Sequence, residues 1–333
     1  MTRLSLIAAR DWAATIFVTH GATDATAQSV ARALVGAEAD SLKGHGLSRI
    51  PTYVRMLDSG KIKGDAVPTF KRPRPAVLLV DAASGFSYPA IDLACAELPA
   101  MAHASGIALA GITRSNHAGA IGQHVERLAD QGLVAIFFAN TPEAIAPWGG
   151  IRAVFGTNPI AFAAPLPGRS PVVIDLALSK VARGNIVAAK QQGIAIPEGW
   201  ALDADGKPTT DATAALAGTM IAMGDAKGAA LALMVEVLAA ALVGSHLSFE
   251  ASSFLDENGP PPETGQSLIV IDPGSLGHGH FGAAMTRLAA AIESQPGARL
   301  PGQRRLAARA KAVDQGLEIP LALITKFGAP GRA

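Results

Sequence analysis

The stretch AVLLVDAASGFSYPAIDLACAELPAMAHASGIALAGIT, residues 76–113, decides the fold of this chain. It begins with a short apolar run at 77–80 and ends with a second one at 107–113. Between them, residues 89–104 are rich in alanine and predict a helix. A strand, a helix and a strand in that order predict an α/β region, and taken alone they favour parallel strands.

The same alternation continues outward from this stretch. A helix is predicted at 123–131, and another at 226–243 whose apolar face is too broad for a surface helix, so we expect it to be buried. Residues 192–217 carry Gly, Pro and Asp at turn-like spacing and predict a long surface excursion. Further strands are predicted at 134–139, 160–164, 172–176 and 267–271.

Helical patterns dominate the start of the chain. Thr23 or Asp24 can cap a helix whose apolar residues share one face, and Pro51 is well placed to begin another. Residues 61–75, rich in Lys, Arg and Pro, predict a connection or an edge hairpin. The sequence therefore predicts a central α/β region with helical ends.

The composition excludes several classes of protein. Of 333 residues, 49% are hydrophobic and 17% are charged, which excludes intrinsic disorder. The 28 Lys and Arg balance the 27 Asp and Glu, so we expect no surface for nucleic acid or for an anionic membrane. The longest apolar run, 229–243, is too short to span a membrane, and the N-terminus is a poor signal peptide. A single cysteine, Cys95, excludes an internal disulfide. We expect a soluble protein of the cytoplasm.

The first candidate site is Gly44-His45-Gly46-Leu47-Ser48-Arg49. A histidine between two glycines is not covered by its neighbours, so its ring projects where a ligand can approach. Arg49 lies on the same side if the chain turns into a helix at Pro51. A proton-donating histidine beside an arginine that clamps a carboxylate suits an acidic substrate. A surface loop in which Arg49 forms an ion pair explains the pattern equally well.

A second candidate is the segment Ser115-Asn116-His117-Ala118-Gly119-Ala120-Ile121-Gly122, between a predicted strand and a predicted helix. A polar, glycine-rich loop of this kind binds anions through backbone N–H groups. His117 is then an acid/base group or a ligand contact. The alternative is a helix-capping loop in which Asn116 forms local hydrogen bonds.

Two charged residues also lie where ligands bind. Asp175 comes at the end of an apolar strand, where side chains emerge from a sheet. Lys227 lies in the first turn of the helix predicted at 226–243, where its charge opposes the helix dipole unless an anion lies in front of it. It is a candidate phosphate contact, or the salt-bridge partner of Asp225.

The segment Gly277-His278-Gly279-His280-Phe281-Gly282 matches the dinucleotide-binding pattern G-x-G-x-x-G only formally. The preceding strand has already ended at Asp272, and the position 20 residues after Gly277 holds a glycine instead of an acid. An exposed glycine turn is favoured. His278 and His280 have no carboxylate-rich partner nearby, so no metal site is predicted.

In this order and at this spacing, several segments resemble the malate/L-lactate dehydrogenase family, which is unrelated to the Rossmann-type lactate and malate dehydrogenases. The resemblance covers nearly the whole chain and is strongest to the Δ1-piperideine-2-carboxylate/Δ1-pyrroline-2-carboxylate reductase branch. The segments that carry it are the two motifs around His45 and His117, and residues 146–150, 155–159, 197–203, 225–228 and 299–302.

The resemblance implies an α/β, non-Rossmann NAD(P)-binding fold. Its central, largely antiparallel sheet is flanked by helices, and a helical domain forms from both chain ends. Residues 1–75 are then expected to pack with 290–333, and residues 76–289 to form the cofactor- and substrate-binding region. The implied assembly is a homodimer.

The resemblance also implies roles for single residues. His45 matches the catalytic proton donor, Arg49 the residue that holds the substrate carboxylate, and His117 a second active-site histidine. Gly44 is a departure, because the family commonly has serine before this histidine. Positions that match cofactor contacts are Ser41, Ile121, Gly122, Gln123, Asp175, Leu176, Ser179, Lys227 and Gly302.

The implied reaction is hydride transfer from NADPH, or from NADH, to the carbon next to a carboxylate. In the most similar branch the substrate is the cyclic imino acid Δ1-pyrroline-2-carboxylate or Δ1-piperideine-2-carboxylate, and the product is L-proline or L-pipecolate. The alternative is an NAD(P)-dependent 2-hydroxy-acid dehydrogenase of the malate, lactate or ureidoglycolate type. A metal-dependent hydrolase or lyase and a non-catalytic NADPH-binding module rank below both.

Overall fold

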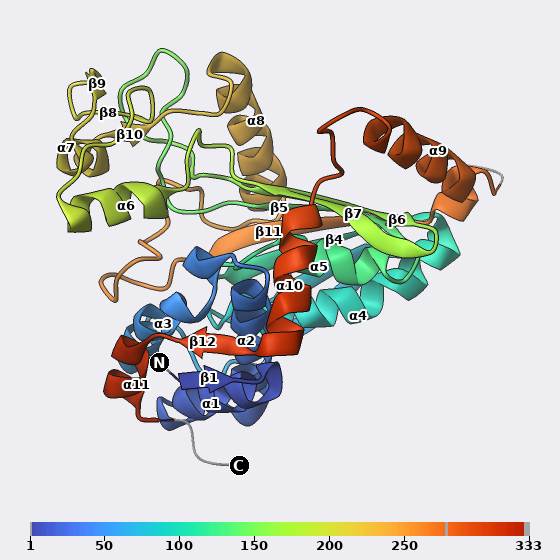
Figure 1. The fold of residues 1–333 in the computed structure, drawn as a ribbon, viewed down its shortest axis with the longest axis horizontal. Helices are drawn as coiled ribbons and strands as arrows, with labels where there is room; N and C mark the ends of the chain where they lie inside the picture. Colours follow the sequence, from blue (N-terminus) through green and yellow to red (C-terminus); the bar gives the residue numbers. More distant parts are fainter. Residues whose placement is uncertain (1, 277–278, 330–333) are drawn as a thin grey trace.

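The computed structural model describes residues 2–276 and 279–329. A seven-stranded sheet with the order β2-β3-β4-β11-β5-β6-β7 forms its centre (Figure 1). β3 and β4 run parallel, and the other neighbouring pairs of this sheet are antiparallel. The strands are β2 (Thr69–Arg74), β3 (Val77–Asp81), β4 (Ile107–Ser115), β5 (Val134–Ala139), β6 (Ile160–Leu166), β7 (Arg169–Leu176) and β11 (Thr264–Ile271).

The largely antiparallel sheet implied by the resemblance is confirmed, and the parallel sheet favoured by the local pattern is wrong outside one pair. β3 and β4 are joined by helix α4 (Ser87–Ser105), as a parallel crossover requires. β11 then inserts between β4 and β5 and is antiparallel to both. This pairing joins segments far apart in the chain, so no local pattern predicts it.

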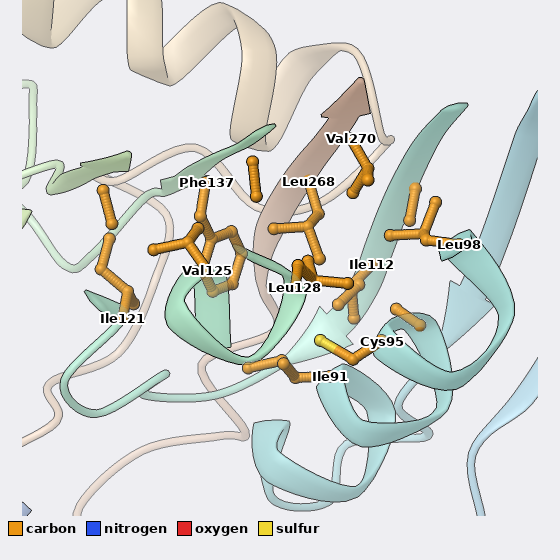
Figure 2. Packing of buried hydrophobic residues seen from close by; sticks show 14 of the residues in the cluster. Ile91, Cys95, Leu98, Ile112, Ile121, Val125, Leu128, Phe137, Leu268 and Val270 are labelled. Atoms are coloured by element: carbon orange, nitrogen blue, oxygen red, sulfur yellow. The ribbon is translucent and has the colours of Figure 1, made fainter. Parts of the chain in front are cut away.

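One face of the sheet is covered by α4 and by α5 (Gly122–Ala129). Figure 2 shows how Ile91 and Leu98 of α4 and Val125 and Leu128 of α5 pack toward the strands. Burial of such apolar side chains is the main stabilising term for this layer. The residues that they meet on the strands include Ile112, Phe137, Leu268 and Val270.

The opposite face is partly covered by α8 (Ala226–Glu236) and by a π-helical turn at Val237–Ala241. Contact here is so close that a Cβ on Gly265 would lie 2.0 Å from the carbonyl oxygen of Ala239. Burial of the whole predicted helix is nevertheless wrong. The regular helix ends at Glu236, and Leu233, Val237 and Leu242 are 51%, 50% and 59% exposed, because only one side of the element meets the sheet.

The two chain ends form a second layer of helices below the sheet in Figure 1. Strand β1 pairs antiparallel with β12, and the helices from both ends share one apolar core. The elements are β1 (Thr2–Leu4), α1 (Leu6–Thr19), α2 (Asp24–Ala39), α3 (Ile50–Asp58), α10 (Gln303–Gln315), β12 (Leu317–Ile319) and α11 (Leu321–Phe327).

The predicted surface excursion at 192–217 has secondary structure of its own. It contributes two strands to a three-stranded sheet of order β10-β8-β9, beside α6 and α7 (Figure 1). None of the helices in the described ranges is both long and apolar enough to cross a membrane. The elements are α6 (Arg183–Gln192), β8 (Ala201–Leu202), β9 (Pro208–Thr209), α7 (Ala212–Ala217) and β10 (Thr219–Met220).

The formal G-x-G-x-x-G match precedes α9 (Phe281–Glu293). Gly277 and His278 lie outside the described residues. Gly279 has a φ of +79°, which favours glycine, and the chain enters α9 directly after His280.

A largely buried cluster of arginine and carboxylate side chains binds α10 to the rest of the molecule. Arg305 and Arg309 of α10 both donate hydrogen bonds to Asp40, after α2, and to Glu126 of α5. The Asp40 side chain is fully buried, and that of Arg305 is 13% exposed. One group of charges therefore holds the C-terminal helix against both the helical end and the sheet layer.

Truncation of this cluster should destabilise the protein. Arg305→Ala leaves two buried carboxylates with only Arg309 as partner, so we expect a loss of about 3 kcal/mol in unfolding free energy. Urea unfolding measures it. The matched control is Arg169→Ala, which removes the exposed ion pair with Glu293 and should change the unfolding free energy far less. Equal losses in the two variants would contradict the structural role of the cluster.

Candidate functional site

The His45 motif forms two short 3-10 turns, Lys43–His45 and Leu47–Arg49, that lead from α2 into α3. A Cβ on Gly46 would lie 2.2 Å from a carboxylate oxygen of Glu38, which accepts the backbone N–H of Leu47 at 3.0 Å. Glycine therefore lets the turn lie against α2 without displacing the Glu38 side chain. Pro51 stands in the first turn of α3, as predicted.

His117, in the loop after β4, meets His45 directly. The two imidazole rings are stacked, with centroids 5.3 Å apart and an interplanar angle of 6°. The backbone of His117 is held at both ends, since its N–H donates to Asn116 Oδ1 at 2.7 Å and its carbonyl accepts from Ser87 Oγ at 2.6 Å. The local hydrogen bond predicted for Asn116 therefore forms, and it positions the histidine.

The electrostatics of this group are those of an anion site. Burial, and then the charge of Arg49, lower the pKa of His45 to about 4. The pKa of His117 is lowered well below its usual value by burial, by Arg49 and by His45. Both imidazoles are thus neutral near pH 7. His45 Nδ1 and Arg49 Nε are buried and make no hydrogen bond among the described residues, which leaves polar atoms ready for a ligand.

Three side chains around this group, and Lys61 behind them, were missed by the sequence reasoning. Tyr53 Oη lies 2.6 Å from His117 Nδ1 and 2.9 Å from Tyr88 Oη. The ring of Phe254 stands edge-on to His117, with centroids 5.4 Å apart. One signal was available for the tyrosines: the chain has only two, and each lies close to a motif or element of the predicted site.

Lys61 fixes the position of Phe254 through hydrogen bonds to the backbone around it. Its side chain is buried, and its ammonium donates to the backbone carbonyls of Ser253, Asp256 and Asn258 at 2.7, 3.0 and 2.6 Å. These three bonds fix the segment that carries Phe254 over His117. No local pattern in the sequence indicates this role, because the partners are about 195 residues apart in the chain.

Most of the predicted cofactor contacts gather in two neighbouring groups. In the first, the Gly122 N–H donates to Asp175 Oδ2 at 2.7 Å, and a Cβ on Gly122 would lie 2.9 Å from the Asp175 side chain. Gly302, at the start of α10 with a φ of +87°, lies against the carbonyl of Val173 two residues before Asp175. The other members are Ser41, which follows the Asp40 bound to α10, and Ile121 and Gln123, which flank Gly122.

The second group follows β7, which ends at Leu176. Ser179 forms a β-bridge with Ala222, and the N–H of Met223 donates to the carbonyl of Leu178 at 2.7 Å. This pairing joins Ser179 to the turn that leads into α8, whose first turn carries the exposed Lys227. Within residues 2–276 and 279–329, Lys227 forms no ion pair with Asp225, so its charge is directed to solvent or to a ligand.

The arrangement fits an extended cofactor better than a single small ligand. Gly122 and Gly302 lie close to the end of β7, and Gln123 Nε2 is buried there without a hydrogen bond among the described residues. A cation at Lys227 completes the second group. These two groups contain the residues that could hold a dinucleotide cofactor.

Comparisons with known proteins match this chain over nearly its whole length. A family model described as malate/L-lactate dehydrogenase matches residues 4–327. The (2R)-3-sulfolactate dehydrogenase (NADP(+)) of Chromohalobacter salexigens is 48% identical over 303 residues, 91% of this chain and 90% of that protein. The Δ1-pyrroline-2-carboxylate reductase of Pseudomonas fluorescens is 42% identical over 313 residues, 93% of each.

The solved structures agree with these matches. The Δ1-piperideine-2-carboxylate reductase from Pseudomonas syringae pv. tomato superposes with a TM-score of 0.93 and is 37% identical in sequence. The superposition covers 98% of this chain and 99% of that one.

The buried histidines should make stability fall in acid. The His124 pKa is lowered to about 4 by burial and by Arg127, and that of His117 lies well below its usual value. Above pH 6.5 both are neutral in the folded and unfolded states, so they give no pH dependence. Below pH 6.5 these histidines bind protons in the unfolded chain but stay neutral in the folded chain. The unfolding free energy should therefore fall by about 1.4 kcal/mol per pH unit for each histidine.

Urea unfolding at pH 7.5, 6.0 and 5.0 measures this slope. His124→Gln keeps a donor toward the Ala118 carbonyl that His124 Nε2 contacts at 3.2 Å, and it should remove one histidine's share of the slope. The control variant is His103→Gln, at an exposed histidine, and the slopes of both variants are compared with that of the wild type. A slope unchanged in His124→Gln would show that this histidine is protonated in the folded protein.

Proposed function

Because the chain belongs to the malate/L-lactate dehydrogenase family, we propose that it is an NADP(H)-dependent oxidoreductase that exchanges hydride with the carbon next to the carboxylate of a small acid. The observation that carries this proposal is the group formed by His45, Arg49 and His117. It combines two neutral imidazoles with a cation and leaves buried polar atoms without partners among the described residues.

Arg49 binds the substrate carboxylate in this mechanism, since a guanidinium matches a carboxylate with two parallel hydrogen bonds. The bound carboxylate offsets the charge of Arg49, which is the second cause of the low His45 pKa. His45 then takes up a proton more readily in the complex than in the free protein. It gives this proton to the substrate heteroatom during reduction and removes it during oxidation.

The nicotinamide supplies or accepts the hydride when it is bound. Ser41, residues 121–123, Asp175, Leu176 and Gly302 would hold one part of the dinucleotide, and Ser179 and Lys227 another. The NADP preference is supported by the Chromohalobacter relative, which is a (2R)-3-sulfolactate dehydrogenase (NADP(+)). Lys227 is a cation suited to a phosphate.

For the substrate we propose a 2-hydroxy acid with a second anionic group, of the 3-sulfolactate type, which is oxidised to the 2-oxo acid. Arg49 is the cation whose charge lowers the pKa values of both His45 and His117, and no carboxylate is among the causes of either shift. Such a site favours an anionic acid. The relative at 48% identity, a (2R)-3-sulfolactate dehydrogenase, supports the second anionic group.

A cyclic imino acid is the second candidate. The Pseudomonas fluorescens relative and the 0.93 TM-score of the piperideine-2-carboxylate reductase favour it. Hydride would add to the carbon of the C=N bond, and His45 would supply or relay the proton to nitrogen. The protonated imine is a cation, however, and it would lie near Arg49 without a carboxylate partner among the described residues.

One assay separates the two candidates. NADPH oxidation is followed with 3-sulfopyruvate, Δ1-pyrroline-2-carboxylate and Δ1-piperideine-2-carboxylate, beside pyruvate and oxaloacetate, and each assay is repeated with NADH. We expect the highest kcat/KM with 3-sulfopyruvate and NADPH. Turnover confined to the cyclic imines would establish the second candidate. No turnover with any of the five acids would overturn both.

Two substitutions test the assigned roles. His45→Ala removes the proton donor, so kcat should fall by about 10²- to 10⁴-fold, while NADPH binding, followed by nucleotide fluorescence, stays nearly unchanged. Arg49→Lys keeps the positive charge but cannot form two parallel hydrogen bonds to the substrate carboxylate. It should therefore mainly lower kcat/KM. Wild-type turnover by His45→Ala would show that another group donates the proton.

We further propose that two copies of the chain pair through the exposed apolar face of α8 and the π-helical turn. Monomeric proteins rarely leave side chains such as Leu233, Val237 and Leu242 in water on one element. Continuity of this face over more than two helical turns suits a second copy of the same helix, related by a two-fold axis.

Light scattering after gel filtration tests the pairing. The wild-type protein should be a dimer, and Val237→Glu should be a monomer because it buries a charge in the interface. Val67→Glu is the control, since Val67 is also exposed but lies elsewhere. A Val237→Glu dimer of wild-type stability would place the contact on another face.

A further inference from the structure

Tyr53 and Tyr88 form a buried chain of hydrogen bonds that ends on one nitrogen of His117. Both tyrosines are about 1% exposed, and they are the two tyrosines of the whole sequence. The contacts run from Tyr88 Oη to Tyr53 Oη at 2.9 Å and from Tyr53 Oη to His117 Nδ1 at 2.6 Å. The mechanism above assigns no role to either hydroxyl.

The direction of this chain follows from counting hydrogens. Each phenol has one hydrogen to donate, and a neutral imidazole has one nitrogen that donates and one that accepts. If His117 Nδ1 carried the hydrogen, it would donate to Tyr53, Tyr53 would donate to Tyr88, and the buried Tyr88 hydrogen would find no acceptor among the described residues. In the opposite direction Tyr88 donates to Tyr53 and Tyr53 donates to Nδ1, so both hydroxyl hydrogens are used.

The second arrangement is the more stable one, because a buried donor without an acceptor is costly. It places the imidazole hydrogen of His117 on Nε2. The ring itself cannot turn over easily, since Ser87 and Asn116 hold its backbone while His45 and Phe254 pack against it. The low pKa of His117 agrees with an uncharged ring.

We propose that Tyr53 and Tyr88 are positioning residues that keep His117 in the tautomer with its hydrogen on Nε2, so that His117 meets the bound substrate as a hydrogen-bond donor. The consequence for the reaction rests on the function proposed above. A donor at this point would bind the substrate's oxygen or nitrogen and leave proton transfer to His45. The two histidines would then have separate tasks in spite of their stacked rings.

The tautomer can be measured without any substrate. In the free protein labelled with ¹⁵N-histidine, long-range ¹H–¹⁵N spectra distinguish a protonated from an unprotonated ring nitrogen, and His117→Gln identifies the His117 signals. We expect wild-type His117 to have a protonated Nε2 and an unprotonated Nδ1. Tyr53→Phe keeps the ring and removes the hydrogen bond, so it should give a mixture of both tautomers.

The matched control is Ser87→Ala. It also removes one buried hydroxyl bond to His117, but on the backbone carbonyl, so it should lower the urea midpoint as Tyr53→Phe does and leave the tautomer unchanged. A protonated Nδ1 in the wild type, or an unchanged spectrum in Tyr53→Phe, overturns the proposal. A tautomer shift in Ser87→Ala equal to that in Tyr53→Phe does so too.

Kinetics test the consequence for the reaction with whichever acid is turned over. Tyr53→Phe should lower kcat roughly tenfold, the effect of one hydrogen bond, with NADPH affinity unchanged. Tyr88 acts only through Tyr53, so Tyr88→Phe should have a smaller effect, and the double variant should match Tyr53→Phe alone. Fully additive losses would show that the tyrosines do not act as one chain.

The spectra test the tautomer and the assays test the proposed function, so either can be contradicted without the other. Absence of turnover with every acid would overturn the proposed function and leave the tautomer assignment intact. The wrong tautomer beside rapid turnover would overturn the role of the tyrosines and leave the function intact.

Discussion

The pairing of β11 with β4 and β5 is the constraint on which the centre of this protein depends. It converts a local strand-helix-strand unit into a largely antiparallel sheet and brings the chain around residue 265 next to the loop after β4. Gln266 Nε2 donates to the carbonyl of Asn116 at 3.2 Å, directly before His117. The segment that leads into β11 carries Phe254, whose ring packs against His117. The same part of the chain therefore contacts His117 through Phe254 and supports the residue before it through Gln266.

The site lies where two separately built cores meet. His45 and Arg49 come from the turns between α2 and α3, in the helical end, whereas His117 comes from the loop after β4, in the sheet layer. The stacked histidines, the Tyr53–His117 contact and the charges around Arg305 all cross this boundary. Any shift of the helical end against the sheet would therefore change the site before it disturbed either core.

Burial and positive charge work together at this boundary. A histidine surrounded by protein and facing an arginine stays neutral, and the arginine stays free for a carboxylate. In the proposed mechanism, the charge of the bound substrate would raise the pKa of His45 again. Such a mechanism needs no acidic residue to tune the histidine, because the ligand itself would change the pKa on binding.

The sequence by itself determined the family resemblance, the helical ends, most strand positions and the residue types at the site, because these depend on local spacing and on short motifs. His45, Arg49 and His117 were all found in this way, with roles that remain proposals. Only the tertiary structure decided that β11 lies between β4 and β5 and that α8 leaves an apolar side exposed. It alone also decided that Tyr53 and Phe254 contact His117, with Tyr88 and Lys61 behind them. The reason is physical: strand order and side-chain contacts join residues up to some two hundred positions apart, and their energy exists only when the chain is folded.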